Sequence, residues 1–206
     1  MEPFTPFTAP ACALDLANID TDQLIPARFM KEPRSVGYDN FLLYDLRFDE
    51  NGELKADFPL NEDLNQSCKT ILARRNFGAG SSREAAVYCL VDYGVRCVIA
   101  PSFGDIFSSN SVNNGLLPAI VSESDCDLLF DAMEGEIKNL SVDLEQQSIS
   151  IGELSVSFDI RPVWKKKLVN GWDDIDLTMQ EEKEISNFQQ AYFSRFDWLF
   201  NSEDRK

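Results

Sequence analysis

The chain has 206 residues, 44% of them hydrophobic, which suffices for one domain with a sizeable core. Its formal net charge of −16 and its lack of a basic cluster exclude a nucleic-acid-binding surface. No apolar run reaches the roughly 20 residues of a membrane helix, and the N-terminal residues lack the basic start and apolar stretch of a signal peptide. We therefore expect a cytosolic, cytoplasmic protein that binds neither nucleic acid nor membranes.

The first third of the chain predicts little regular structure. Residues 12–17 alternate and predict a strand, followed by a polar loop and a short helix before Pro33. Between residues 33 and 68, prolines and glycines interrupt scattered aromatic and acidic side chains. We expect a long irregular loop there, serving as a lid or binding segment, although an inserted hairpin is an alternative.

The middle of the chain predicts a βαβ unit. Residues 69–75 and 95–100 predict strands, and residues 82–93 between them predict a helix that Gly94 ends. The two strands should be parallel with a right-handed crossover. A second loop and helix at 102–114 and a short strand at 117–121 follow.

The last third predicts a helix and then a second group of strands. Residues 123–134 predict an acidic amphipathic helix, and 137–144, 147–151 and 154–160 predict strands. A capping box from Thr178 to Glu181 should open a helix that runs to about residue 196. We expect a single domain over 1–206, an α/β fold with two sheets and a helical layer, and a C-terminal helical extension over 178–206.

The C-terminal helix carries an aromatic stripe at helical spacing. Such a stripe usually belongs to a core, and a contact with another subunit is the alternative. Its members are Phe188, Tyr192, Phe193, Phe196, Trp198 and Leu199.

The chain does not offer an obvious metal site of its own. Its five cysteines are scattered without a C-x-x-C pair, and the sequence contains no histidine. An odd number of cysteines in a cytosolic chain favours free, buried thiols. We therefore expect no zinc site or iron–sulfur cluster held by this chain alone.

The most informative segment, residues 76–84, joins a predicted strand to a predicted helix through two glycines. Such a junction presents backbone N–H groups to an anion, and Arg83 could clamp a carboxylate. The spacing matches neither G-x-G-x-x-G nor a P-loop, which disfavours nucleotide binding. The alternative is that Ser81 and Glu84 form only a capping box without a ligand.

The sequence contains two further polar clusters. The loop containing Ser102 and Asp105 leaves the neighbouring parallel strand, so both loops should share one crevice, although helix capping is the simpler role for these two residues. Asp20, Thr21 and Asp22 form the third cluster, for which an ordinary turn is the alternative.

Five segments together resemble the small subunit of bacterial 3-isopropylmalate dehydratase, a member of the aconitase superfamily. They follow the family order and extend over nearly the whole chain: 18–27 (NIDTDQLIPA), 76–84 (NFGAGSSRE), 98–107 (VIAPSFGDIF), 114–118 (NGLLP) and 170–175 (NGWDDI).

The resemblance implies a swivelling domain of three layers, β/β/α, that closes over a [4Fe–4S] cluster held by the large (iron–sulfur) subunit in a heterodimer. It implies that Ser81 is the catalytic base, that Arg83 binds a carboxylate of a small dicarboxylate substrate, and that Asp22 lies in the active site. Thr21, Gly80 and Ser82 are the other predicted substrate-binding residues. The implied reaction interconverts 2-isopropylmalate and 3-isopropylmalate in leucine biosynthesis. It requires a base, which this chain offers, and a Lewis acid, which must come from the partner.

The match departs from the family motif N-F-G-C-G-S-S-R-E-H-A at two positions. We assign the family's cysteine to Ala79 and its histidine to Ala86. Loss of the histidine leaves two alternatives open: a diverged, non-catalytic or regulatory paralogue, or a dehydratase for a related alkylmalate or homocitrate. The pocket for the substrate's side chain should lie in the loop from about Arg28 to Tyr44. A stand-alone anion-binding domain is a third alternative.

Overall fold

A computed structural model describes residues 1–62, 65, 67–134, 139–196 and 198. The chain divides into two compact units, Met1–Gly171 and Trp172–Lys206, and each is described by itself. No helix in these described ranges has both the length and the apolar character needed to cross a membrane.

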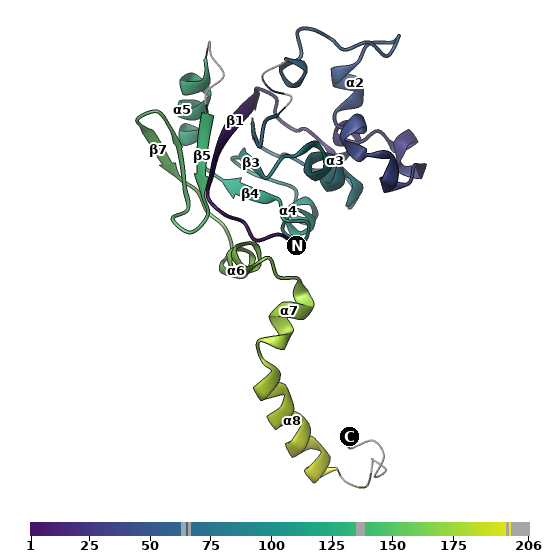
Figure 1. The fold of residues 1–206 in the computed structure, drawn as a ribbon, viewed down its shortest axis with the longest axis vertical. Helices are drawn as coiled ribbons and strands as arrows, with labels where there is room; N and C mark the ends of the chain where they lie inside the picture. Colours follow the sequence, from purple (N-terminus) through teal and green to yellow (C-terminus); the bar gives the residue numbers. More distant parts are fainter. Residues whose placement is uncertain (63–64, 66, 135–138, 197, 199–206) are drawn as a thin grey trace. The chain divides into compact units, whose positions relative to one another are not determined.

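The first unit is built around one sheet, whose seven strands in the described residues are ordered β4-β3-β2-β1-β5-β6-β7 (Figure 1). β1 pairs in parallel with β2 and antiparallel with β5, so it joins a parallel part to an antiparallel part. The strands are β1 (Phe7–Leu14), β2 (Thr70–Ala73), β3 (Cys97–Ala100), β4 (Leu117–Ile120), β5 (Asn139–Asp143), β6 (Ser148–Ile151) and β7 (Leu154–Ser157).

The strand predictions are largely confirmed. β2, α3 (Ala85–Tyr93) and β3 form the expected parallel βαβ unit, and β2 pairs with β3 in parallel. The first strand was wrongly placed, because β1 begins at Phe7 and ends at Leu14. Its antiparallel pairing with β5 extends it toward the N-terminus, which no local pattern reveals. Residues 137 and 138 of the predicted strand over 137–144 lie outside the described residues.

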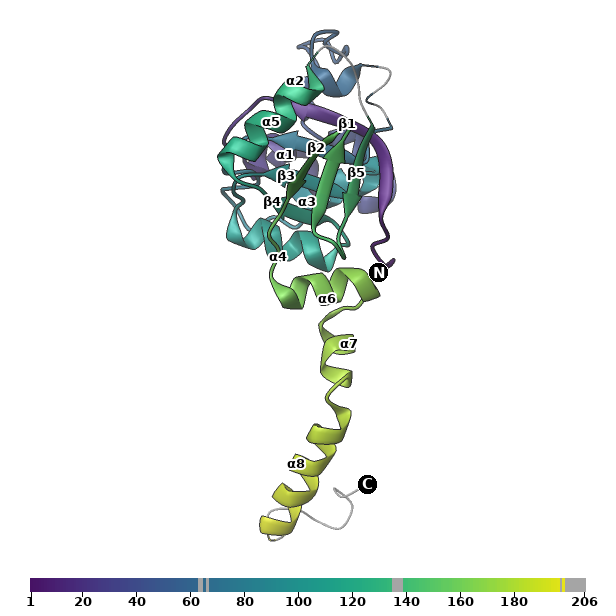
Figure 2. The same ribbon diagram turned by 90° about the vertical axis from the view of Figure 1, so that its left-hand side faces the viewer.

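Alternation along the strands divides the core into two parts. Ile71 and Ala73 of β2 belong to a cluster that includes Val87 and Leu90 of α3. Leu72, between them in sequence, belongs to a second cluster with residues of the antiparallel strands. Figure 2 shows the antiparallel strands lying over the parallel part of the sheet. The predicted α/β fold with β/β/α layers is confirmed, but the expectation of two separate sheets is wrong, because β1 pairs with both β2 and β5 and joins the two parts into one curled sheet.

The remaining helical elements of this unit are short. They comprise α1 (Thr21–Leu24), α2 (Tyr44–Arg47), α4 (Asp105–Asn113), α5 (Glu123–Met133), α6 (Pro162–Asn170) and 3-10 turns at Ala27–Lys31, Arg34–Val36, Tyr38–Phe41 and Pro59–Asn61. The helix predicted over 123–134 is thereby confirmed as α5.

The long segment over 33–68 is more ordered than an irregular loop. Its helical turns bury Leu42, Leu43 and Leu60 in the core cluster that also contains residues of α3. The expected alternative, a hairpin, is reduced to a single antiparallel bridge between Phe48 and Leu54. Residues 63, 64 and 66 lie outside the described residues. This segment is therefore anchored to the core through these leucines, while many of its other described residues are exposed.

Arg47 holds this segment together from within. Its side chain is 8% exposed, and it donates hydrogen bonds to Asn61 Oδ1 at 3.0 Å and to the Leu42 carbonyl at 3.3 Å. The guanidinium also lies 5.2 Å from the Tyr93 ring. Burial lowers the pKa of Arg47, because desolvation disfavours its charge.

The second unit contains two helices, α7 (Asp174–Met179) and α8 (Glu182–Arg195). The predicted capping box from Thr178 to Glu181 is wrong: Thr178 lies inside α7 and donates to the Asp174 carbonyl. The box forms instead between Asp173 and Asp176. The predicted end of the last helix near residue 196 is confirmed.

The aromatic stripe of α8 does not form a core within the second unit. No residue of α8 is buried in that unit taken by itself. Helical spacing shows which side chains share a face but not what covers that face. Leu199 lies outside the described residues.

Candidate functional site

The site is built where β1 and β2 end, because their following loops run side by side. The Asn18 N–H donates to the Arg75 carbonyl at 2.9 Å, and the Gly78 N–H donates to the Ile19 carbonyl at 2.6 Å. The Thr21 N–H then donates to the Ala79 carbonyl at 2.9 Å. These bonds bring the cluster of Asp20, Thr21 and Asp22 against the glycine-containing segment, at the carboxyl ends of parallel strands where ligand sites usually lie.

The loop after β3 joins the same edge. The Phe77 N–H donates to the Ser102 carbonyl at 3.0 Å, and the Gly104 N–H donates to the Phe77 carbonyl at 2.9 Å. The Ser102 hydroxyl accepts from the Asn76 N–H at 2.9 Å. The two loops therefore lie side by side, as predicted.

The expected capping role of Ser102 and Asp105 is not what the structure contains. Gly104 is the N-cap of α4 and Asp105 is the first residue of that helix, without a side-chain cap. Ser102 instead links two loops across the sheet edge. The local sequence suggests a helix cap because it does not reveal the actual partner of Ser102, Asn76, which lies 26 residues away in the chain.

Two glycines permit this close packing. A Cβ atom on Gly104 would lie 2.6 Å from the Gly78 carbonyl oxygen. Gly78 itself has φ +70, and a Cβ there would lie 2.2 Å from the ring of Phe107. The loops can approach each other only because these side chains are missing.

Thr21 is a buried residue that contacts the backbone of the 76–84 loop. Asp20 caps α1 through a capping box with Gln23, which accounts for the turn expected here. Thr21 is 1% exposed, and its hydroxyl oxygen accepts a hydrogen bond from the Ser81 N–H at 2.9 Å. Because Thr21 is buried and already bonded, it positions Ser81 and does not suit the direct substrate contact predicted for it.

Arg83 and Asp22 face each other on the exposed side of the loop. The Arg83 guanidinium forms an ion pair with the Asp22 carboxylate, with side-chain exposures of 19% and 60%. Gly80, Ser81 and Ser82 are exposed beside this pair. Among the described residues, no hydrogen bond occupies the backbone N–H groups of Gly80, Ser82 or Arg83. These groups can therefore serve an anion.

The helix begins later than the sequence predicts. α3 starts at Ala85, its N-cap is Glu84, and no side chain caps it. The alternative role of Ser81 and Glu84 as a capping box is therefore wrong. Glu84 instead accepts a hydrogen bond from Asn114 Nδ2 at 2.9 Å. Ser81 and Arg83 belong to the loop, which frees their side chains from helix geometry.

The histidine position of the family motif also needs correction. Counting from Arg83 and Glu84, the histidine corresponds to Ala85, and Ala86 corresponds to the alanine that follows it. Ala86 is fully buried, whereas Ala85 is partly exposed at the start of α3. An imidazole would have room to reach the site only from Ala85.

The cysteines do not belong to the site. Cys12, Cys68, Cys89, Cys97 and Cys126 are all free and buried. Burial raises the pKa of Cys68 and of Cys89 to about 12, since the thiolate is poorly solvated there. In the described residues, no three Cys, His, Asp or Glu side chains gather into a metal-binding group. The described residues therefore do not fit an iron–sulfur cluster.

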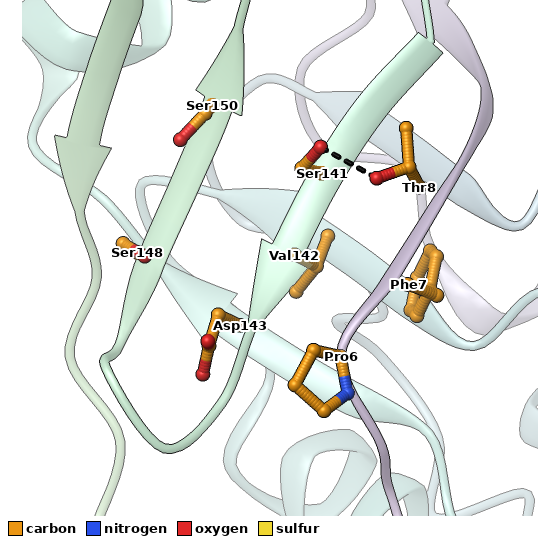
Figure 3. Close-up of a pocket in the computed structure, with 8 residues that line it drawn as sticks. All are labelled: Pro6, Phe7, Thr8, Ser141, Val142, Asp143, Ser148 and Ser150. Carbon is orange, nitrogen blue, oxygen red and sulfur yellow. Dashed lines mark hydrogen bonds between the residues drawn. The ribbon is translucent and has the colours of Figure 1, made fainter.

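A hollow on the outer face of the antiparallel strands is the wrong place for a dicarboxylate. It is lined by Pro6, Phe7, Thr8, Ser141, Val142, Asp143, Ser148 and Ser150 (Figure 3). The Thr8 and Ser141 hydroxyls bond to each other at 2.7 Å. The lining contains a carboxylate and no cation, and it lies at the beginning of β1, whereas the Arg83 site follows its end.

Comparison with known proteins decides the family. Residues 1–124 match the model of the aconitase C-terminal domain, and residues 174–202 match that of the C-terminal domain of 3-isopropylmalate dehydratase small subunits. The small subunit of Caulobacter vibrioides strain NA1000 is 44% identical over 200 residues, covering 97% of this chain and 99% of its own length. This chain belongs to the 3-isopropylmalate dehydratase small-subunit family.

Other relatives agree with this assignment. The small subunit of Bacillus subtilis strain 168 is 42% identical over the same proportions of both chains. A crystal structure of 3-isopropylmalate dehydratase (leuD) from Methanocaldococcus jannaschii superposes with a TM-score of 0.63 at 22% identity. It covers 90% of this chain and 99% of the other, which supports the fold. The family supplies a subunit of a hydro-lyase of leucine biosynthesis.

Proposed function

We propose that this chain is the small subunit of a heteromeric 3-isopropylmalate dehydratase and supplies Ser81 as base and Arg83 as carboxylate ligand. The observation that carries the proposal is the Arg83–Asp22 ion pair beside Ser81, whose backbone is held by the buried Thr21. We further propose a large subunit that bears a [4Fe–4S] cluster as the partner. A cytoplasmic location is part of the proposal, and the five free cysteines support it.

Ser81 would remove the proton from the carbon next to a substrate carboxylate. The C–H electron pair forms the new double bond, the proton passes to Ser81 Oγ, and the hydroxyl leaves the neighbouring carbon. A serine alkoxide needs strong stabilisation, because the hydroxyl is a weak acid. Arg83 and the unoccupied N–H groups of Gly80 and Ser82 lie close by in sequence and would provide it.

Arg83 would bind the carboxylate that activates this proton. Its guanidinium presents paired N–H donors, and Asp22 already occupies part of that fork. Asp22 thereby fixes the direction of the guanidinium before substrate arrives. The net charge of −16 repels a dianionic substrate at long range. The Arg83 guanidinium would therefore have to attract the substrate at short range.

The partner's cluster would act as the Lewis acid for the departing hydroxyl. Nothing in the described part of this chain could bind that group. The division of labour is therefore complementary: base and carboxylate ligand on this chain, Lewis acid on the other.

The test is to mix the purified chain anaerobically with the reconstituted large subunit of the same organism and to follow isomerisation of 2-isopropylmalate. Ser81→Ala and Arg83→Lys should each lower kcat/KM at least a hundredfold, since each removes a group needed in the transition state. Arg96→Lys is the matched control. Arg96 directly precedes β3, so it lies at the end of the parallel strands opposite the site.

Other outcomes would favour the alternatives. A stable complex without turnover on any alkylmalate would favour a regulatory paralogue. Turnover only on a related alkylmalate or on homocitrate would keep the chemistry and change the substrate. No complex with the large subunit would refute the heteromeric proposal.

A further inference from the structure

Glu84 places a carboxylate next to the proposed carboxylate ligand, Arg83. It is exposed, and although it is the N-cap of α3, its side chain does not cap that helix. In a chain with a net charge of −16, a further carboxylate beside a dianionic substrate repels that substrate. Any benefit of Glu84 to the site must therefore come from the groups that its carboxylate binds.

Asn114 is the first of these groups. Its side-chain Nδ2 donates to Glu84 Oε1 at 2.9 Å and to the Asn110 carbonyl at 2.9 Å, so both hydrogens of the amide are used. Asn114 is also the C-cap of α4, and its backbone N–H donates to carbonyls of the last turn. The amide therefore has a fixed direction, and it joins the 76–84 loop to a helix end 30 residues later in the chain.

Tyr88, one turn into α3, is the second group. Its hydroxyl donates to the Glu84 carboxylate, and burial together with this bond raises the pKa of Tyr88. The Tyr88 ring lies 3.9 Å from the Arg34 guanidinium, which forms an ion pair with Asp92 at 2.7 Å. The Glu84 carboxylate is thus held by two groups that are themselves held in place.

Arg83 lies between two anchored residues. On one side, the Ser81 N–H donates to the Thr21 hydroxyl at 2.9 Å, and on the other, Glu84 is held through its carboxylate. The Asp22 side chain that pairs with Arg83 is 60% exposed, and an exposed ion pair holds a backbone only weakly. Asp22 can therefore direct the guanidinium only where the two anchors keep the Arg83 backbone in place.

We infer that Glu84 is a positioning residue, which holds the Arg83 backbone through Asn114 and Tyr88 so that the guanidinium meets the substrate carboxylate. The inference rests on the proposed function, which gives Arg83 that role. Because Ser81 has its own anchor at Thr21, loss of the Glu84 anchor should impair substrate binding more than proton transfer. It should therefore raise KM more than it lowers kcat.

The experiment compares Glu84→Ala with Glu84→Gln in the reconstituted complex, with 2-isopropylmalate as substrate. Glu84→Ala should raise KM about tenfold and lower kcat by less than about threefold, since one charge-assisted anchor is lost. Glu84→Gln keeps an oxygen that accepts from Asn114, so it should return KM to within about twofold of wild type. Glu123→Ala is the matched control, because Glu123 is also an exposed carboxylate at the start of a helix, α5, and its loss should leave the kinetics unchanged.

Asn114→Ala tests the partner of Glu84 and serves in its place if Glu84→Ala does not fold. It should raise KM to the same degree as Glu84→Ala. The double variant should be no worse than Glu84→Ala alone, because both changes break the same hydrogen bond.

Hydrogen exchange on the isolated chain gives a readout that does not need activity. The Ala86 N–H donates to the Arg83 carbonyl at 3.2 Å, so its exchange reports whether the Arg83 backbone keeps its place. Exchange at Ala86 should speed up about tenfold in Glu84→Ala and stay near the wild-type rate in Glu84→Gln.

The outcomes separate this inference from the proposed function. Wild-type KM in Glu84→Ala and Asn114→Ala, or an equal rise of KM in Glu84→Ala and Glu84→Gln, would overturn the inference and leave the proposed function intact. Additive effects of Glu84→Ala and Asn114→Ala would overturn it as well. A wild-type complex without turnover would overturn the proposed function and, with it, the positioning of Arg83 for a substrate carboxylate.

Discussion

Replacing Thr21 by valine tests whether a buried side chain positions the loop that carries the proposed base, Ser81. Valine has the shape of threonine and lacks the hydroxyl that accepts the Ser81 N–H at 2.9 Å. Thr21 is 1% exposed, so water cannot easily take the place of that oxygen. Thr21→Ser is the matched control, because it keeps the hydroxyl and removes only a methyl group.

The expected magnitude depends on how the loop responds. Leaving a buried donor unsatisfied costs about 1–3 kcal/mol. Ser81 is exposed, so the loop can shift until its N–H reaches water, which limits the loss of stability to about 1 kcal/mol. For a chain of this size that corresponds to a fall of about 2–4 °C in melting temperature. The shift would move Ser81 from its working position, and a displacement near 1 Å costs about a hundredfold in rate.

The assays are thermal unfolding of the isolated chain and isomerisation of 2-isopropylmalate by the reconstituted complex. Thr21→Val should lose between about tenfold and a hundredfold in kcat while it unfolds only slightly earlier than wild type. Thr21→Ser should retain most of the activity. Full activity of Thr21→Val, or equal loss in both variants, would refute the positioning role.

Two further predictions concern stability. Arg47→Met should lower the free energy of unfolding by about 2 kcal/mol, because charged hydrogen bonds to Asn61 and to a buried carbonyl are lost; an unchanged urea midpoint would contradict this. The thiols of Cys68 and Cys89 have folded pKa values raised to about 12, above roughly 8.5 in the unfolded chain. Their contribution to stability is complete below pH 8.5 and is lost as the pH rises toward 12, at about 1.4 kcal/mol per pH unit and thiol. The free energy of unfolding in urea should therefore fall less between pH 8 and pH 10 in a Cys68→Ala, Cys89→Ala double variant than in wild type. An equal fall in both proteins would argue against buried thiols.

Local patterns predicted the elements whose own residues decide them. The strands and helices from β2 through β7 follow from short apolar runs and turn residues, since each buries a face that its own periodicity defines. The sequence predicts that segment 76–84 is a ligand-binding junction, because its glycines and polar residues are adjacent. The order of the parallel strands predicts that the Ser102 loop lies nearby. Asp22 is assigned to the same site only by the family resemblance.

Elements that depend on distant partners were placed less well. The start of β1 is set by antiparallel pairing with β5, more than 100 residues later, and α3 starts three residues late because the loop before it is bonded to Thr21. The role of Ser102 depends on Asn76, and the capping box of the last unit moved to Asp173. In these cases the local sequence suggests one hydrogen-bond partner or element boundary, and the folded chain uses another.

The sequence by itself determined the layers of the fold, the free thiols and the residues of the candidate site, because alternation, composition and adjacent polar groups are local properties. Only the tertiary structure decided that Arg83 pairs with Asp22, that the Thr21 hydroxyl accepts the Ser81 N–H, and that the Ser102 hydroxyl accepts the Asn76 N–H. These are relations between segments far apart in the chain. They depend on which surfaces the packed core brings together, and no single segment contains that information.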